Sequence, residues 1–412
     1  MEIRLDHPEV LSDFESAPLR RVRRWVGVGL GLWLSLLAAD WSARFLVFRW
    51  HRQWMPTVPA TPSGGAGADA AAARTFAVPA QTGGGLTAML GMPWLAKRYE
   101  EFHPGYSVPM DPFGYRNPPL PEGRPSDVVM LGDSFLLSLG TQNVAQALAS
   151  IGGRPVYNHA RAGAGPFQEM WKFIASDRFD PPPPVVVWNL SARELGAPLF
   201  SRQPVDYWFA RARSDRESDA GPAPTRIRRD LLDPRVLRQS WPDTSLAAYG
   251  SRRAWMWIRF LVFREWPKEV RGVEDPVWGP MLFYGENLRL LPLYRPEVDA
   301  PAVVQTAVKV AHGFRERGMS LVVLLVPEKE QIHARALPPE DRQTLARGPE
   351  LLSAIERGLL DAGVPTVNLI PAFQEATARG ERLYWRDDTH WNDAGIRLAA
   401  EELWRVVEPL LP

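Results

Sequence analysis

Short, almost entirely apolar runs alternate with longer amphipathic segments from about residue 127 to the end of the chain. A run of this kind lacks the polar alternation of a half-exposed strand and is typical of a strand buried on both faces of a parallel sheet. Five such runs predict strands at residues 127–131, 155–160, 185–190, 320–327 and 365–370. The four prolines before the third run precede the expected ladder, where they remove no hydrogen bond from the sheet.

The segments between these strands carry apolar residues at helical spacing. They predict helices at about residues 143–152, 166–174, 302–318 and 350–363, and a final helix from about Asp393. Between about residues 199 and 296 the alternation fails and arginine, tryptophan and turn residues dominate, so we expect a helical insertion there. Strands that alternate with helices predict an α/β fold, here a three-layer α/β/α sandwich around a mainly parallel sheet.

An apolar segment near the start of the chain follows a cluster of four arginines between residues 20 and 24. Its uninterrupted part, residues 25–39, is shorter than the roughly 20 residues that span a bilayer, but the apolar character continues to Phe48. We therefore predict a transmembrane helix, an uncleaved signal anchor, at residues 25–48. A cleaved secretory signal is less favoured because no clean small-x-small site follows Ala39, and a buried hydrophobic helix is the third interpretation.

The arginine cluster places residues 1–24 in the cytoplasm under the positive-inside rule. The rest of the chain then lies across the inner membrane in a single-pass arrangement and faces the periplasm or the cell exterior. Residues 49–90 are the expected linker, because residues 56–85 are rich in Pro, Ala and Gly and poor in large apolar side chains. Residues 91–412 are the predicted main domain.

Composition narrows the classes of chemistry. The 412 residues carry 48 Lys and Arg against 47 Asp and Glu, a formal net charge of +1, so no overall field attracts a nucleic acid. The chain contains no cysteine, which excludes disulfides, thiol nucleophiles and zinc–thiolate sites. Neither a Gly-rich phosphate loop followed by Lys-Ser or Lys-Thr nor a His-Glu-x-x-His motif occurs, so we expect no nucleotide cofactor and no metal.

The first predicted strand ends on Gly-Asp-Ser, with Ser134 at the corner. A serine nucleophile needs a base that takes its proton, and the base needs a carboxylate that orients it. His390, in a loop before the final helix, supplies the base and Asp388 the acid, while Asp387 is the alternative acid that the spacing leaves open. The carboxyl ends of parallel strands line one edge of a sheet, where both elements can meet. Ser134 as an ordinary helix cap is the competing interpretation.

Acyl transfer also needs N–H groups that face the developing oxyanion. The Ser134 amide at the strand-to-helix corner is one such donor. Gly163, in a glycine-containing stretch after the second strand, is the expected second donor, and Asn189 at the end of the third strand can add its side-chain amide. The alternatives are that Gly163 only permits a turn and that Asn189 only caps a strand end.

These residues together resemble the SGNH (GDSL-like) hydrolase superfamily. The resemblance rests on Gly-Asp-Ser at 132–134, the stretch 158–163, Asn189 and the late Asp-x-His. The form DDTHWNDAG and the lead-in DPFGYRNP at residues 111–118 are similar to the SGNH-like domains of alginate O-acetyltransferases and related cell-surface polysaccharide acetylation proteins. The resemblance comes in scattered blocks and leaves the insertion unmatched.

The resemblance implies a membrane-anchored serine acyltransferase that O-acetylates a surface or exported polysaccharide through an acyl-serine intermediate. It also implies two partners, a polysaccharide acceptor and a polytopic membrane protein that exports acyl groups. A secreted or periplasmic carbohydrate esterase is the first alternative, because hydrolysis and transfer share every step up to the acyl-enzyme. A non-catalytic SGNH-like protein that binds polysaccharide or scaffolds an export complex is the second.

Overall fold

A computed structural model of the chain forms two compact units, residues 1–66 with 221–265 and residues 67–220 with 266–412. The structure describes residues 28, 31–35, 38, 74–78, 81–82, 86, 102–103, 106–111, 113–118, 126–138, 141–176, 179–217, 246–263, 265–345 and 347–412.

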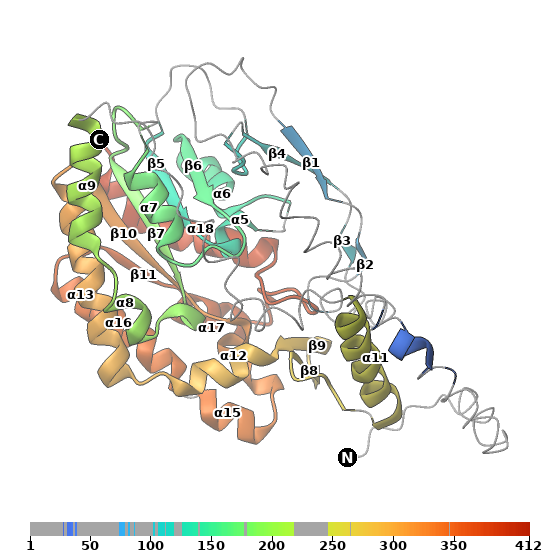
Figure 1. Cartoon of the computed structure of the whole chain (residues 1–412). Coiled ribbons are helices and arrows are strands. Elements are labelled where there is room, and N and C mark those ends of the chain that lie inside the picture. Colours follow the sequence, from blue (N-terminus) through green and yellow to red (C-terminus); the bar gives the residue numbers. More distant parts are fainter. Residues whose placement is uncertain are drawn as a thin grey trace. The chain divides into compact units, whose positions relative to one another are not determined.

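A five-stranded parallel sheet forms the centre of the second unit (Figure 1). Its strands run in the order β11-β10-β7-β5-β6. Every residue of β5, β6 and β7 is buried, which is why their sequences are mostly apolar. All five predicted strands are confirmed; they are β5 (Val128–Gly132), β6 (Val156–Ala160), β7 (Val185–Ser191), β10 (Ser320–Val326) and β11 (Thr366–Asn368).

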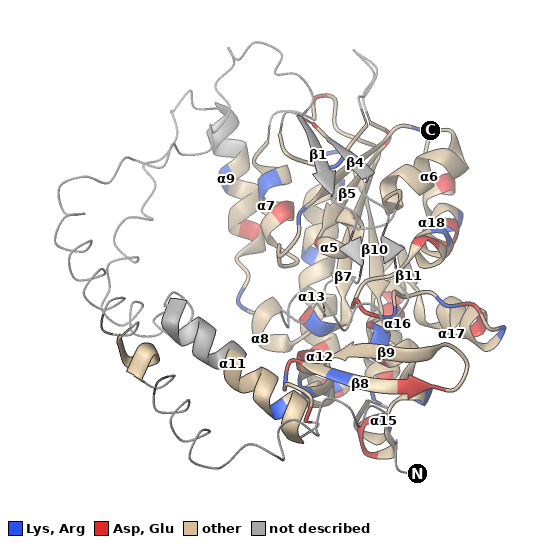
Figure 2. Ribbon diagram, turned by 90° about the vertical axis from the view of Figure 1, so that its right-hand side faces the viewer, with Lys and Arg blue, Asp and Glu red and all other residues tan. Residues whose placement is uncertain are grey.

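Helices cover both faces of this sheet, so the predicted three layers are present (Figure 2). One face is covered by α6 (Val144–Gly152) and α18 (Asp393–Val407), which pack against each other. The other face is covered by α7 (Gln168–Ile174), α9 (Val205–Glu217) and α13 (Pro296–Arg315), and α16 (Gly348–Asp361) packs on α13. The shorter helices of this unit are α5 (Ser134–Leu137), η2 (Ala192–Glu194), α8 (Ala197–Phe200), α12 (Gly285–Leu290), η5 (Leu291–Leu293), α14 (Lys329–Ile332), η6 (Ala334–Ala336), α15 (Pro339–Leu345), α17 (Ile370–Ala378) and η7 (Glu408–Leu410).

The strand order creates a switch point beside β5. This strand lies between β6 and β7, with Val128 opposite Val156 on one side and Val185 on the other. After β5 the chain continues to α6 on one face of the sheet, whereas after β7 it continues to α9 and α13 on the opposite face. The carboxyl ends of β5 and β7 therefore border the position at which open α/β sheets bind ligands.

The insertion between residues 199 and 296 is not wholly helical, so that prediction is wrong in part. Besides α9 and α11 (Leu246–Phe263), it contains an antiparallel hairpin of β8 (Val270–Asp275) and β9 (Gly279–Tyr284). Asp275 Oδ1 closes the turn by accepting the backbone N–H groups of Val277 and Trp278 at 2.7 and 3.0 Å. Residues of β8 alternate irregularly between buried and exposed, so the sequence has no clear period of two.

Four short strands lie near the N-terminal side of the second unit. β1 (Arg74–Val78) pairs with β4 (Tyr106–Met110), and β2 (Gln81–Thr82) pairs with β3 (Phe102–His103), both antiparallel. β1 and β2 fall inside the predicted linker 49–90. That part of the linker therefore contains paired strands and is not wholly irregular. The Thr, Phe and Val of β1 suit a strand, and its partner lies outside the Pro- and Gly-rich stretch.

The predicted anchor at residues 25–48 lies mostly outside the described residues, as do residues 1–24. The residues described there, at 28, 31–35 and 38, are helical and exposed. Within the part of the chain that the structure describes, no helix combines the length and the apolar character needed to cross a bilayer.

Candidate active site

Ser134 stands just beyond the carboxyl end of β5, as the first residue of the short helix α5. The cap of this helix is Asp133, whose Oδ1 accepts the Phe135 backbone N–H at 2.9 Å. Because the aspartate fills the cap position, the Ser134 hydroxyl is left to make a different contact. The interpretation of Ser134 as the helix cap is therefore wrong.

His390 lies within hydrogen-bond distance of Ser134. Its Nε2 is 2.7 Å from Ser134 Oγ, and its Nδ1 is 2.6 Å from Asp388 Oδ1. The same Oδ1 accepts the His390 backbone N–H at 2.9 Å. The contact with the carboxylate requires a proton on Nδ1, which leaves Nε2 free to accept the serine proton. Acid, imidazole and serine thus form one continuous line of hydrogen bonds.

Of the two candidate acids, Asp388 is the one beside the imidazole. Its side chain is 4% exposed and that of His390 15%, so their contact is largely shielded from water. Asp387 is also buried, and its backbone carbonyl accepts the Leu86 N–H at 3.0 Å. The geometry therefore places Asp388, and not Asp387, in contact with the imidazole.

The loop that carries His390 is fastened directly to α5. The indole N–H of Trp391 donates to the Phe135 carbonyl at 2.9 Å, and the two rings pack edge to face. Asn392 caps α18 by accepting two backbone N–H groups of its first turn at 3.0 and 3.1 Å. The imidazole is therefore positioned between the start of α18 and the helix that begins with the serine.

The two residues expected to help bind an oxyanion have different surroundings. Gly163 is exposed and has φ +72°, in the left-handed region that glycine adopts without strain. Its loop starts beside the end of β5, because the Arg161 N–H donates to the Gly132 carbonyl at 3.2 Å. The Asn189 amide donates to Asp133 Oδ1 at 3.0 Å, so in this structure one of its N–H groups supports the cap of α5.

The lead-in at residues 111–118 holds the far end of α5. Arg116 Nη1 donates to the carbonyls of Ser138 and Leu137 at 2.6 and 3.2 Å. Ser138 is buried and has φ 55°, an unfavourable conformation for a residue other than glycine. Asn117 accepts the Asn158 backbone N–H at 2.7 Å and so ties the lead-in to β6. The sequence indicated this segment only through its resemblance to a family, and its supporting role comes from the structure.

A buried network of charges lies at the ends of β7 and β10. Arg193 Nε is 3.4 Å from Glu328 Oε1, and the guanidinium lies 5.2 Å from the centre of the ring of Phe135, the residue after Ser134. Asn287, from the insertion, donates to Glu328 and Glu330 at 3.0 and 2.9 Å. Sequence reasoning did not identify this network, because charged residues after a strand usually lie in solvent.

Burial dominates the protonation of these carboxyl groups. It raises the pKa of Glu328 to about 7, an effect that Arg193 opposes. It also raises the pKa of Glu194 to about 8, with a further increase from the negative charge of Asp133. The shared cause is the removal of these carboxylates from water, which disfavours their charged form.

No group of three or more His, Cys, Asp or Glu side chains is arranged to hold a metal ion among the described residues. What the site does offer is a hydroxyl, an imidazole that can accept its proton, and a shielded carboxylate that stabilises the resulting imidazolium. This arrangement can form and break acyl esters.

Comparison with known proteins relates the chain to enzymes of this kind. Residues 52–192 and 280–411 match the family described as SGNH hydrolase-like domain, acetyltransferase AlgX. The chain is 27% identical over 118 residues to the probable alginate O-acetylase AlgJ of Pseudomonas putida, and 24% identical over 121 residues to that of Azotobacter vinelandii. Each match covers 28% of this chain and 30% of the relative, so the chain spans under a third of their length.

Solved structures give a weaker comparison. A GDSL-like lipase from Bacteroides thetaiotaomicron aligns with 69% of this chain and 88% of its own, with 11% identity and a TM-score of 0.32. A mutant of the acetylxylan esterase Axe2 from Geobacillus stearothermophilus aligns with 68% of this chain and 94% of its own, with 10% identity and a TM-score of 0.32. The family match supports esterase or acyltransferase activity.

Proposed function

This chain belongs to the AlgX acetyltransferase family of SGNH hydrolase-like domains, and from that premise we propose that it is a serine O-acyltransferase that acetylates a polysaccharide. The observation that carries the proposal is the line of hydrogen bonds from Asp388 through His390 to Ser134, with distances of 2.6 and 2.7 Å. We further propose that the Gly163 loop and the Ser134 amide border the position that an acyl oxygen would occupy, since the Arg161 N–H of that loop donates to the Gly132 carbonyl.

The first half of the reaction loads the enzyme. His390 Nε2 takes the Ser134 proton while Oγ attacks the carbonyl carbon of an acyl ester. The oxyanion that forms faces the backbone N–H groups of Ser134 and Gly163. When the intermediate collapses, the bond to the donor's oxygen breaks and His390 gives its proton to that leaving alcohol. The acyl group is now esterified to Ser134.

The second half repeats these steps with an acceptor hydroxyl. The hydroxyl gives its proton to His390 and attacks the acyl carbon, and Ser134 leaves and recovers the proton. Asp388 stabilises the imidazolium in both halves. A sugar hydroxyl as acceptor gives an acetylated polysaccharide, whereas water gives acetate. The alginate O-acetylases that the chain resembles over part of their length support a polysaccharide acceptor.

We propose that the protein works while attached to the inner membrane, with this site in the periplasm or outside the cell. The arginine cluster before the apolar segment at residues 25–48 supports that orientation. The described helical residues Leu32, Trp33 and Leu34 are 62%, 38% and 53% exposed, as side chains that face lipid would be. Acyl donors made in the cytoplasm reach such a site through a membrane protein, which is why we include a polytopic partner.

An acceptor-dependence assay tests this proposal. The full chain, in detergent, is incubated with a chromogenic acetyl ester with and without an oligosaccharide, and both acetylated sugar and acetate are quantified. We expect acetylated sugar from the wild type and from Ser150→Ala, which alters an exposed serine on α6, and none from Ser134→Ala.

The other outcomes separate the alternatives. Acetate without acetylated sugar, from a reaction that depends on Ser134, would identify an esterase. No turnover, with oligosaccharide binding unaffected by Ser134→Ala, would identify a non-catalytic binding or scaffold protein.

A further inference from the structure

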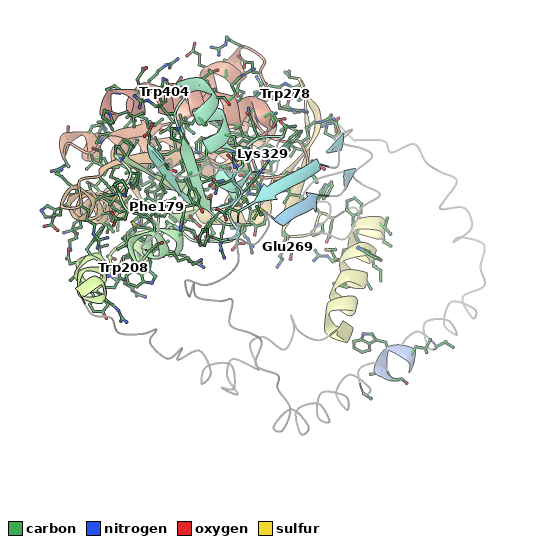
Figure 3. All side chains as sticks on the ribbon, turned by 90° about the horizontal axis from the view of Figure 1, so that it is seen from above. Phe179, Trp208, Glu269, Trp278, Lys329 and Trp404 are labelled. Carbon is green, nitrogen blue, oxygen red and sulfur yellow. The ribbon has the colours of Figure 1, made fainter. Side chains whose placement is uncertain are left out.

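Lys329 is a fully buried lysine three residues after the end of β10, as the first residue of α14 (Figure 3). Its ammonium donates to four backbone carbonyls. These belong to Leu282 at 2.7 Å, Trp385 at 2.5 Å, Arg386 at 2.8 Å and Asp388 at 3.0 Å. An ammonium has three N–H donors, so at least one of them is shared between two carbonyls.

Three of these four carbonyls belong to the loop that carries the acid of the proposed triad. Burying an ammonium costs several kcal/mol unless its donors are satisfied, and here backbone dipoles satisfy them. The Phe283 ring, whose centre lies 5.2 Å from Nζ, adds a cation–π contact. The loop cannot move away from Lys329 without leaving a buried charge unsolvated, so the contact holds the main chain at Asp388.

The insertion takes part in the same contact. The Leu282 N–H of β9 donates to the Arg386 carbonyl at 2.7 Å, while Lys329 binds the carbonyls of both residues. Arg386 Nη1 in turn donates to the Trp278 carbonyl in the hairpin turn at 3.3 Å. The hairpin β8–β9 and the acid-bearing loop are therefore joined at Lys329.

We propose that Lys329 is a positioning residue for the triad. It does not reach the reacting atoms, but it fixes the backbone of residue 388 so that one carboxylate oxygen meets both the backbone N–H and Nδ1 of His390. The inference rests on the proposed function, in which Asp388 and His390 serve Ser134. Without the ammonium the carbonyls lose their common donor, the loop relaxes, and the imidazole loses its fixed orientation.

Lys329→Met tests this in the full chain, because methionine has a similar length and no charge. We expect kcat to fall by about 10²-fold, since a misplacement of about 1 Å in a catalytic group has that effect. KM should stay within about twofold, because no substrate contact is removed. Lys309→Met, which removes a half-exposed lysine of α13, is the matched control and should leave both parameters unchanged.

A second readout does not depend on turnover. A proton between His390 Nδ1 and Asp388 at 2.6 Å is expected to give a low-field ¹H NMR resonance in the wild type and in Lys309→Met. Lys329→Met should lose or broaden it, and Asp388→Asn should do the same. If the wild type proved inactive but Lys329→Met still lost the resonance, the positioning role would stand and the proposed function would fall.

A folded Lys329→Met variant that keeps the resonance and a kcat within about threefold of the wild type would overturn the proposal.

If Lys329→Met does not fold, Lys329→Gln replaces it as the test. Lys329→Gln retains a polar donor for the carbonyls and should fold, with an intermediate loss of kcat. If this variant folds with normal kcat and resonance, or if neither variant folds, Lys329 serves stability and not the alignment of the triad.

Discussion

Replacing Asp388 by asparagine keeps the size of the side chain but changes what it offers to His390. The carboxylate Oδ1 accepts from Nδ1 at 2.6 Å and from the His390 backbone N–H at 2.9 Å. In Asp388→Asn the side chain is neutral and no longer stabilises the imidazolium, and an amide N–H that faces the ring favours the tautomer with its proton on Nε2. That tautomer cannot take the proton of Ser134.

We therefore expect kcat of Asp388→Asn to fall by about 10³ to 10⁴-fold, since the corresponding change in a serine protease triad has an effect near the upper value. At about 1.4 kcal/mol for each factor of ten, the activation free energy rises by about 4 to 5.5 kcal/mol. The assay is the initial rate with a chromogenic acetyl ester at saturating concentration, with circular dichroism to verify that the variant is folded.

Asp387→Asn is the matched control, because it makes the same change one residue earlier on a buried side chain that is not the partner of His390. We expect its kcat to stay within about threefold of the wild type, because the orientation of the imidazole is preserved. A larger loss of kcat in Asp387→Asn than in Asp388→Asn would refute the assignment of the acid and the reasoning from the tautomer.

Three further predictions concern the support of the site. Gly132→Ala would place Cβ 2.8 Å from the Asn189 Cβ, so we expect the free energy of unfolding in urea to fall by about 1–3 kcal/mol. Gly165→Ala, whose Cβ would meet no atom within 4 Å, should change it little. Equal losses in the two variants would contradict the close approach at Gly132. The raised pKa of Glu194, about 8, means that its stabilising contribution is present at low pH and is lost as pH rises from about 4.5 to 8. Glu194→Gln should flatten the fall in unfolding free energy over that range, and an unchanged pH profile would count against it. Trp391→Phe removes a buried indole donor, so thermal unfolding should show a loss of stability of about 1–3 kcal/mol. Ester turnover should show a lower kcat as well. A loss of stability alone would show that the contact does not position the base.

The central sheet could be predicted from the sequence because its strands are buried on both faces. Val185–Ser191 and Ser320–Val326 are mostly apolar, and short apolar runs that alternate with helices are typical of a parallel sheet covered on both faces. The hairpin in the insertion had no such signal. Residues of Val270–Asp275 alternate irregularly between buried and exposed, so their hydrophobic pattern has no period.

The candidate site divides in the same way. Ser134 and His390 stood out because the first ends a buried strand and the second lies in an acidic loop before a helix. The choice between Asp387 and Asp388 could not be made from spacing, since both lie within reach of His390 along the chain. It depends on backbone geometry, which places one Oδ1 within 2.6 Å of the ring and 2.9 Å of the amide.

The residues that sequence reasoning missed are the buried charges. Lys329 and Glu328 sit in a segment that, as a sequence, looks like an ordinary solvated turn after a strand. Their partners are an arginine after β7, an asparagine in the insertion and carbonyls near residue 386, all distant along the chain. Only the fold brings these groups together, so no local pattern could have indicated them.

The most direct measurement of the central claim is mass spectrometry of the full chain, quenched rapidly during turnover of an acetyl ester and then mapped by peptides. We expect one acetyl group on the peptide that contains Ser134, its absence in Ser134→Ala, and its discharge when an oligosaccharide acceptor is added. Turnover that continues in Ser134→Ala, or an acetyl group that forms on a different residue, would show that Ser134 is not the nucleophile.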